Sequence, residues 1–205
     1  MIVSQLRTTG VNELSVLDAL RAVPREDFVE PSRRPVAYAD VATPAGGGRF
    51  LLPPEVLGGL IQKAGLKPGE SALVIGGATG YAAAVLAEMG LDVTLLESDP
   101  VLAERARALL NGKARVVEGA LAEGTKKGAP FDFILIDGAV EDVPAALIKL
   151  LRDGGRLATV QAGAATVGRA AMGVRADGAF ALRPFADAPA AVRLPGFECA
   201  KAFQF

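Results

Sequence analysis

The 205-residue chain contains no histidine, no tryptophan and a single cysteine, Cys199. The lack of histidine excludes serine–histidine and cysteine–histidine catalysis, histidine metal ligation and histidine general-base chemistry. With one cysteine as well, the chain lacks the usual zinc ligands, so we expect no metal site. A single cysteine also excludes an internal disulfide, which favours a reducing compartment, and we expect a cytoplasmic protein.

The chain also lacks a large net charge and long apolar runs. The chain has 22 Lys and Arg residues against 23 Asp and Glu, with both signs interspersed. This balance disfavours nucleic-acid binding, for which a basic surplus or patch is usual. No apolar run approaches the length of a membrane span, and residues 1–10 lack the apolar core of a signal peptide. We therefore expect neither a nucleic acid nor a membrane as partner; oligomeric state is left open.

The composition is sufficient to form a hydrophobic core. The chain is 51% hydrophobic and 22% charged, and its length suits one domain. We predict a single domain over residues 1–205. A helical and loop segment would span 1–65, and the main core 70–205.

The pattern centres on residues 71–81, Ser-Ala-Leu-Val-Ile-Gly-Gly-Ala-Thr-Gly-Tyr. They predict a buried strand, a glycine-rich turn and the start of a helix. About twenty residues later, a second apolar strand ends in the acid Glu97. This is the layout of a nucleotide-type cofactor site, in which glycines let the backbone approach the ligand and the acid accepts hydrogen bonds from ribose hydroxyls.

Strands and helices are predicted to alternate along most of the chain. Asn12 and Asp99 are the expected N-caps, and Pro100 stands at the first position of its helix. Strand 131–136 is expected to end in Asp137. The predicted elements are helix 11–22, loop 41–54, helix 55–64, strand 71–75, helix 81–89, strand 92–96, helix 99–110, strand 114–117, strand 131–136, helix 144–151 and strand 156–161.

The short, continuous apolar strands predict a parallel sheet with helices on both faces. After residue 163 the pattern changes. Segments 169–175 and 180–184 flank an Ala-Asp-Gly turn and predict a β-hairpin, and 197–205 resembles a final strand. The fold class is therefore α/β and Rossmann-like, mostly parallel with an antiparallel C-terminal strand, preceded by an N-terminal helical segment.

Several short motifs follow one another in a specific order and spacing. They are Val23-Pro-Arg-Glu26 with Phe28, Ala37-Tyr-Ala-Asp40, Pro44, Gly46-Gly-Gly48, Pro68-Gly69, Thr79-Gly-Tyr81, Ala83-Ala-Val-Leu-Ala87, Pro130-Phe-Asp132 and Gly154-Gly155. Together they resemble the protein-L-isoaspartate O-methyltransferase family of class I S-adenosylmethionine (SAM) dependent methyltransferases. The resemblance covers roughly residues 5–161.

The resemblance implies SAM as cofactor and predicts which residues contact it. The family turn reads Glu-Ile-Gly-Thr-Gly-Ser-Gly-Tyr, so Val74 replaces its acid and Ala78 its middle glycine. An alanine there is strained if the position needs positive φ. Ala120 stands where the family has an adenine-contacting Asp. The predicted cofactor-binding residues are Gly76, Gly77, Ala78, Gly80, Tyr81, Glu97, Ser98, Gly119, Ala120 and Asp137.

The substrate loop departs most from the family motif Gly-Gln-Thr-Ile-Ser-Gln-Pro. The aligned stretch is Gly48-Arg-Phe-Leu-Leu-Pro-Pro54, and Leu52 falls on the family Ser that is implicated in isoaspartyl methyl transfer. No catalytic residue is therefore assigned. Phe50, Leu51 and Leu52 either pack the loop onto the core or form an apolar surface for a partner, and packing is the favoured interpretation. Arg25 or Arg49 could neutralise an acceptor carboxylate.

Three functions remain open. The first is a SAM-dependent methyltransferase of the family, acting on an isoaspartyl or other carboxylate of a protein or peptide. Carboxylate methylation needs little acid–base help, because positioning provides most of the rate, and it suits a chain without histidine. The second is a degenerate member that binds a protein or another ligand. The third, an NAD-dependent oxidoreductase, is disfavoured, because Ala78 and Ala82 interrupt the Gly-x-Gly-x-x-Gly pattern.

Overall fold

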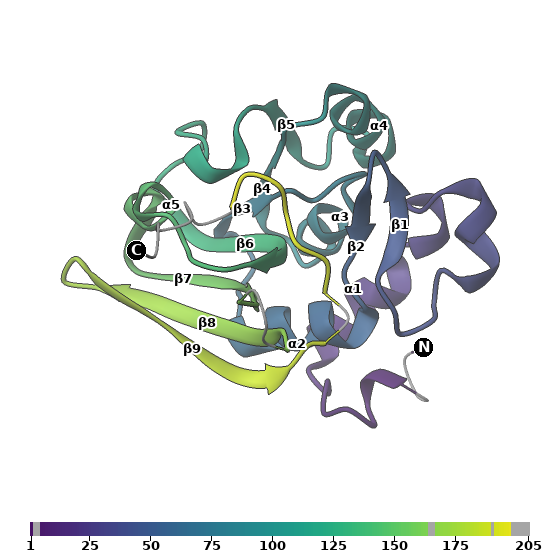
Figure 1. The fold of residues 1–205 in the computed structure, drawn as a ribbon, viewed down its shortest axis with the longest axis horizontal. Coiled ribbons are helices and arrows are strands. Elements are labelled where there is room, and N and C mark those ends of the chain that lie inside the picture. Colours follow the sequence, from purple (N-terminus) through teal and green to yellow (C-terminus); the bar gives the residue numbers. More distant parts are fainter. Residues whose placement is uncertain (2–4, 164–166, 190, 198–205) are drawn as a thin grey trace, which may run out of the picture.

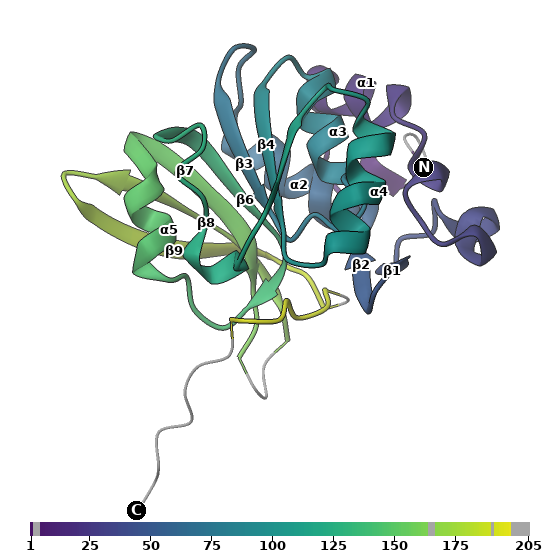
Figure 2. The same ribbon diagram turned by 90° about the horizontal axis from the view of Figure 1, so that it is seen from above.

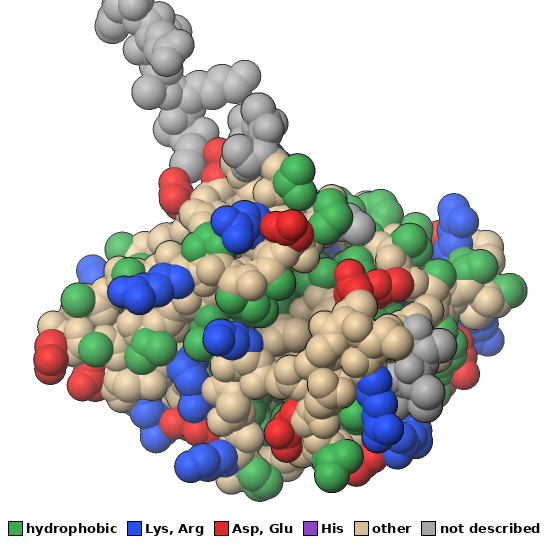
Figure 3. Space-filling model, turned by 90° about the horizontal axis from the view of Figure 1, so that it is seen from below, with side chains coloured by type: hydrophobic (Ala, Val, Ile, Leu, Met, Phe, Trp, Pro, Cys, Tyr) green, Lys and Arg blue, Asp and Glu red, His purple; other side chains and the backbone are tan. Residues whose placement is uncertain are grey.

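The computed structural model describes residues 1, 5–163, 167–189 and 191–197. A seven-stranded sheet forms its centre, and helices cover both faces (Figure 1). Within the described residues, no helix is both long and apolar enough to cross a bilayer. On the face seen in Figure 3, Lys and Arg side chains are interspersed with Asp and Glu.

The strand order of the sheet is β5-β4-β3-β6-β7-β8-β9. The first five strands in this order are parallel, whereas β8 and β9 are antiparallel additions beside β7. The strands are β3 (Ser71–Ile75), β4 (Asp92–Glu97), β5 (Arg115–Glu118), β6 (Phe131–Val140), β7 (Leu151–Gln161), β8 (Arg169–Ala176) and β9 (Ala179–Asp187).

Successive side chains of the central strands enter two different hydrophobic cores, since residues alternate between the faces of a sheet. Val74 and Leu95 lie in the larger core, whereas Leu73, Ile75 and Leu96 lie in the smaller one. Both cores exclude water, and β3 is therefore almost entirely buried. This explains why its sequence is a continuous apolar run instead of an alternating one.

The helices divide unequally between the two faces (Figure 2). Four of them contribute to the larger core: α1 (Leu14–Ala22), α2 (Pro54–Ala64), α3 (Tyr81–Glu88) and α4 (Pro100–Leu110). The opposite face is covered by α5 (Ala145–Leu150), the 3-10 turn η4 (Leu121–Glu123) and part of the chain near residues 194–197. Two further 3-10 segments, η2 (Arg25–Asp27) and η3 (Pro31–Val36), follow α1.

The predicted parallel core and the C-terminal hairpin are confirmed. β8 and β9 are joined by Asp177 and Gly178, both with positive φ, as tight hairpin turns require. Asp99 caps α4 through hydrogen bonds from the amides of Val101 and Leu102. The final strand predicted over 197–205 falls almost entirely outside the described residues.

Four element predictions were wrong. Strand β7 begins at Leu151 and not at residue 156, so it follows α5 directly. The first helix begins at Leu14, not at residue 11, because the Asn12 and Glu13 amides bind the Gln62 side chain and Asn12 caps nothing. Strand β6 does not end at Asp137 but continues to Val140, beyond a register shift against β7. Loop 41–54 contains a two-stranded hairpin, β1 (Thr43–Gly46) with β2 (Arg49–Leu51).

The topological switch point of the parallel sheet lies between β3 and β6, and we use the word crevice for the carboxyl edge of the sheet at this point. β4 lies on one side of β3 and β6 on the other, so the chain reverses its winding direction here. In open α/β sheets, ligands bind outside the carboxyl ends of the strands at such a switch point. The turn after β3, Glu97 at the end of β4 and Asp137 in β6 all lie at this edge.

Candidate functional site

The glycine-rich turn after β3 bends sharply on three residues with positive φ. Gly76 has φ 70°, Ala78 50° and Gly80 97°. The left-handed conformation expected at position 78 is thus adopted by an alanine, which costs roughly 1–2 kcal/mol relative to the ordinary region. Gly80 also lets α3 approach α4, since a β-carbon there would lie 3.1 Å from Leu110 Cδ1.

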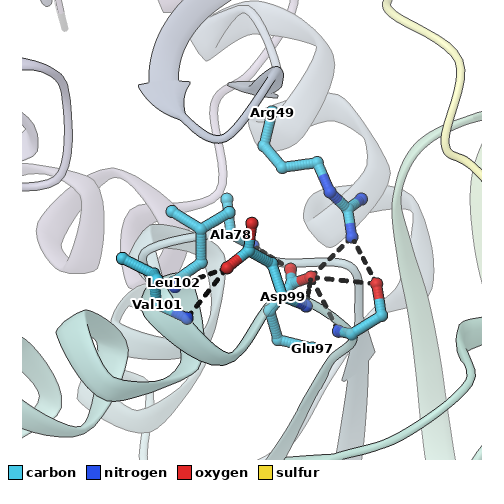
Figure 4. Close-up of polar contacts among 7 residues, drawn as sticks. Arg49, Ala78, Glu97, Asp99, Val101 and Leu102 are labelled. Atoms are coloured by element: carbon cyan, nitrogen blue, oxygen red, sulfur yellow. Dashed lines mark hydrogen bonds and ion pairs between the residues drawn. The ribbon is translucent and has the colours of Figure 1, made fainter.

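Glu97 receives hydrogen bonds on both carboxylate oxygens and is fully buried (Figure 4). Its Oε2 accepts the Ala78 amide at 3.0 Å, which ties the acid to the turn. Its Oε1 accepts the amides of Ser98 at 2.7 Å and Asp99 at 3.1 Å. These backbone amides hold the carboxylate at the crevice, as expected of an acid that receives ribose hydroxyls.

Arg49 supplies the remaining partner of Glu97. It lies at the start of β2, and its Nη2 donates to Glu97 Oε1 at 2.5 Å and to Ser98 Oγ at 3.2 Å. The Arg49 side chain is only 6% exposed, and its Nη1 has no hydrogen-bond partner. The hairpin β1–β2 therefore places a buried positive charge directly on the acid of the crevice.

Leu194 fills the crevice from the other side. A β-carbon built on Gly76 would lie 2.9 Å from Leu194 Cδ2 and 3.3 Å from Arg49 Nη1. One built on Gly138 would lie 2.6 Å from Leu194 Cγ. The leucine therefore packs directly onto the turn after β3 and onto β6.

The chain around Leu194 is held in place by backbone hydrogen bonds to β6. The Leu194 amide donates to Ala139 O, and the Ala139 amide donates to Val192 O, both at 2.9 Å. Figure 1 shows this stretch crossing the carboxyl ends of the strands. We call residues 191–197 the closing segment.

Asp137 is a buried carboxyl beside these charges. Burial raises its pKa to about 7, although the nearby guanidiniums of Arg25 and Arg49 oppose the shift. Its Oδ1 has no hydrogen-bond partner, and Oδ2 would lie 3.7 Å from a β-carbon built on Gly77. Asp137 thus faces the cofactor turn, as its predicted role requires.

Arg25, in η2, contacts three separate parts of the chain. Its Nε donates to Ala37 O at 2.7 Å and its Nη2 to Leu52 O at 2.8 Å. The guanidinium also lies 4.8 Å from the ring centre of Tyr81, which in turn packs edge-on against Phe28. Burial lowers the pKa of Arg25 and raises that of Tyr81. Arg25 is therefore fixed by backbone carbonyls, unlike Arg49.

The other predicted residues lie around this centre. Gly119 donates its amide to the backbone carbonyl of Glu97 at 3.1 Å, and Ala120 is the exposed residue preceding η4. Leu52 is 3% exposed and Leu51 1%. Both pack into the core, as the favoured interpretation of the substrate loop expected.

Comparison with known proteins gives concordant results. The family model for protein-L-isoaspartate(D-aspartate) O-methyltransferase matches residues 1–168. A protein-L-isoaspartate O-methyltransferase of Methylorubrum extorquens is 39% identical over 77% of this chain and 70% of its own length. One from Koribacter versatilis is 37% identical, over 77% and 72%. The chain belongs to the protein-L-isoaspartate(D-aspartate) O-methyltransferase family.

Solved structures share the fold of this family member. A protein-L-isoaspartate O-methyltransferase superposes with a TM-score of 0.79 at 22% identity; the match covers 94% of this chain but 64% of that one. A Plasmodium falciparum protein described as a putative protein-L-isoaspartate O-methyltransferase, in complex with S-adenosylhomocysteine, gives 0.76 at 18% identity, covering 91% and 93%. Family membership makes the chain a class I methyltransferase with SAM as its cofactor.

The backbone of the site fits that cofactor, and two side chains take part of its space. The bent turn and the anchored Glu97 are in place to receive a ribose. Unpartnered buried atoms, Arg49 Nη1 and Asp137 Oδ1, border the same crevice. However, Arg49 already binds Glu97, and Leu194 lies against Gly76. A cofactor bound at this turn would therefore have to displace these two side chains.

Sequence reasoning did not find Leu194 or the role of Arg49 at Glu97. No motif marks Leu194, because an isolated leucine near the C-terminus is indistinguishable from any core residue. Arg49 was noted only as a candidate for an acceptor carboxylate. One signal did exist for it: an arginine lies between Gly48 and Phe50, within a stretch otherwise built of glycine, proline and apolar residues.

Proposed function

We propose that this methyltransferase esterifies a carboxylate of a protein or peptide, and that isoaspartyl peptides are poor acceptors. The observation that supports it most is the carboxylate of Glu97, buried and anchored to the turn through the Ala78 amide. Its position at the end of β4, beside the glycine-rich turn, is where the fold places a ribose-binding acid. The relatives are named for methylation of a protein carboxyl, which supports a protein or peptide carboxylate as the acceptor class.

The chemistry needs little from the side chains. Bound in the crevice, SAM would supply an electrophilic methyl group: a carboxylate oxygen would form the ester C–O bond as the methyl C–S bond breaks, with neutral S-adenosylhomocysteine as the leaving group and no proton transferred. The chain would contribute the orientation of both partners and the exclusion of water. The lack of histidine is no obstacle to this reaction, whereas it would hinder methylation of a weakly acidic hydroxyl.

Position 52 argues for slow isoaspartyl methylation. The resemblance places a serine hydroxyl there, and this chain has a leucine whose side chain is buried. Leu52 contributes only its backbone carbonyl, which accepts a hydrogen bond from Arg25. The acceptor is thus another carboxylate, or an isoaspartyl group held without that hydroxyl.

A single cysteine and the chain's composition favour a cytoplasmic setting for this reaction.

The test is methyl transfer from labelled SAM to an isoaspartyl peptide, to the same peptide with a normal aspartyl bond, and to aged protein. In at least one of these acceptors we expect base-labile label, which is the behaviour of a methyl ester. On the isoaspartyl peptide we expect a lower rate of methylation than that of a family enzyme that has the serine. Glu97→Gln should weaken S-adenosylhomocysteine binding, and the exposed Glu104→Gln serves as its control.

A second function is supported by the filled crevice. Arg49 on Glu97 and Leu194 on Gly76 are what a family member that had lost its cofactor would show. Such a protein would act by binding a partner or another ligand. No binding of S-adenosylhomocysteine at millimolar concentration, together with no label in any acceptor, would establish this second function and refute the first.

A further inference from the structure

Oε1 of Glu97 has no room for another donor. It accepts N–H groups from Ser98, Asp99 and Arg49. An oxygen of a carboxylate binds about two donors along its lone pairs. Oε2 accepts only the Ala78 amide and can take one hydroxyl, but a ribose that uses both oxygens must replace a donor on Oε1. The Ser98 and Asp99 amides belong to the backbone that follows β4, so they are harder to displace than a side chain.

Arg49 is the partner that can leave. It lies on a short two-stranded hairpin, and its flexible side chain reaches the acid through a hydrogen bond from Nη2 to Glu97 Oε1. Its second nitrogen, Nη1, is buried without a partner beside Gly76. A guanidinium with one nitrogen on a carboxylate and the other unpaired is half of a bidentate carboxylate-binding fork.

From this arrangement we infer that Arg49 is the residue that binds the acceptor carboxylate, and that it becomes available only when the cofactor's ribose replaces it on Glu97. The inference rests on the proposed function. Before cofactor binding, the fork is occupied by Glu97. Once ribose hydroxyls take over Oε1, both nitrogens of Arg49 face the crevice from the hairpin. Binding is therefore ordered, with the cofactor first and the acceptor second.

Charge balance explains why the second ligand is an anion. Separating the buried pair leaves Glu97 with neutral hydroxyl donors and leaves Arg49 with only the nearby carboxyl of Asp137 to balance its charge. An acceptor carboxylate would supply the missing negative charge. Arg25 also has a buried Nη1 without a partner, but its Nε and Nη2 already donate to the carbonyls of Ala37 and Leu52. A ribose on Glu97 would release neither of these bonds, so Arg25 is not freed by the cofactor.

The first experiment measures S-adenosylhomocysteine binding by calorimetry to the wild type and to Arg49→Met, which keeps the length of the side chain without its charge or donors. We expect Arg49→Met to bind about tenfold tighter or more, the size of one charge-assisted hydrogen bond removed from competition. The exposed Arg34→Met is the charge-matched control and should bind as the wild type does. Equal or weaker binding by Arg49→Met overturns the inference.

The second experiment measures the KM for the acceptor that is labelled in the methylation assay. We expect Arg49→Met to raise this KM about tenfold or more, so that one substitution tightens the cofactor and weakens the acceptor. An unchanged KM would remove Arg49 from the acceptor site. A merely structural role would weaken both ligands together, which also contradicts the inference.

Leu194→Ala and Arg49→Lys guard against misfolding of the first variant. Leu194→Ala opens the crevice without touching a charge, so it should tighten S-adenosylhomocysteine binding. Arg49→Lys retains the cation but not the two-pronged donor, so it should bind S-adenosylhomocysteine like the wild type and give an acceptor KM between those of wild type and Arg49→Met. If wild type and variants all fail to bind S-adenosylhomocysteine, the proposed function itself fails. Binding without tightening in Arg49→Met and Leu194→Ala defeats only this inference.

Discussion

At the scale of single residues, Asp137 couples the stability of the protein to pH. Its carboxyl is buried among Arg25, Arg49 and Glu97, and burial raises its pKa to about 7, against about 4 in an unfolded chain. Between these values the folded protein holds a proton that the unfolded chain releases. This contribution to the free energy of unfolding is therefore complete below about pH 4 and is lost as the pH rises towards 7.

Asp137→Asn should remove this dependence. The amide cannot ionise, so we expect the variant to gain stability relative to the wild type by about 1.4 kcal/mol for each pH unit within the window. Urea unfolding of both proteins at about pH 5 and about pH 8 measures the difference. The exposed Asp92→Asn is the control and should show no such trend. A difference between Asp137→Asn and wild type that stays constant with pH would contradict the account.

Leu52 gives a second prediction at this scale. Its side chain is 3% exposed and belongs to the larger core. Leu52→Ser removes buried methyl groups and buries a hydroxyl, so we expect a loss of about 2–5 kcal/mol in the free energy of unfolding. Val41→Ser, at a position that is 50% exposed, should cost far less. Denaturant titration compares them, and equal losses would show that Leu52 is not a core residue.

The sequence predicts some of these residue environments and misses others. The strain at Ala78 could be expected, because an alanine stands where the family turn has a glycine, and its φ of 50° bears this out. The environment of Asp137 could not, since its pKa depends first on burial in the finished fold and then on Arg25 and Arg49, which are far away in the sequence. Whether the predicted cofactor residues contact the ligand stays a prediction.

At the scale of elements, α4 is a helix whose first residue can be predicted from the sequence. Asp99 Oδ1 accepts the amides of Val101 at 2.8 Å and Leu102 at 3.2 Å, and Pro100 follows it in the first turn. The preceding residue, Ser98, borders the carboxylate of Glu97. The cap therefore fixes the helix end next to the candidate site.

Asp99→Ala should lower the free energy of unfolding by about 0.5–2 kcal/mol, the usual contribution of an N-cap. It should also weaken S-adenosylhomocysteine binding slightly, because the chain after Glu97 becomes less ordered. Asp92→Ala is the control at the exposed first residue of β4. Chemical denaturation decides the matter: a loss no larger than that of Asp92→Ala would mean that the cap contributes nothing.

Elements with a local signal are predictable, and elements without one are not. β3 and α4 follow directly from an apolar run and from a capping residue. The hairpin β1–β2 was predicted as a loop, because Pro44, Gly46, Gly47 and Gly48 conceal any alternation of side chains. The pairing of its two strands depends on the packing of Leu51 and Ala45 into the core. No local sequence pattern predicts this packing.

At the scale of the whole molecule, the site is assembled from segments that are far apart in sequence. The turn after β3, the hairpin β1–β2 and the closing segment meet at the carboxyl ends of the parallel strands. Parallel order follows from the alternation of strands and helices, so the location of the crevice was predictable. Its closure by Arg49 and Leu194 was not, because it depends on two contacts across the finished fold.

The most direct measurement is a crystal structure of the protein with S-adenosylhomocysteine. We predict that the ribose hydroxyls lie on Glu97, that the Arg49 guanidinium has left Oε1 and turned its free nitrogens into the crevice, and that Leu194 has withdrawn from Gly76. A complex in which the ligand occupies the crevice while the Arg49–Glu97 pair and the Leu194 contact persist would contradict the account. So would a failure of the ligand to bind at millimolar concentration.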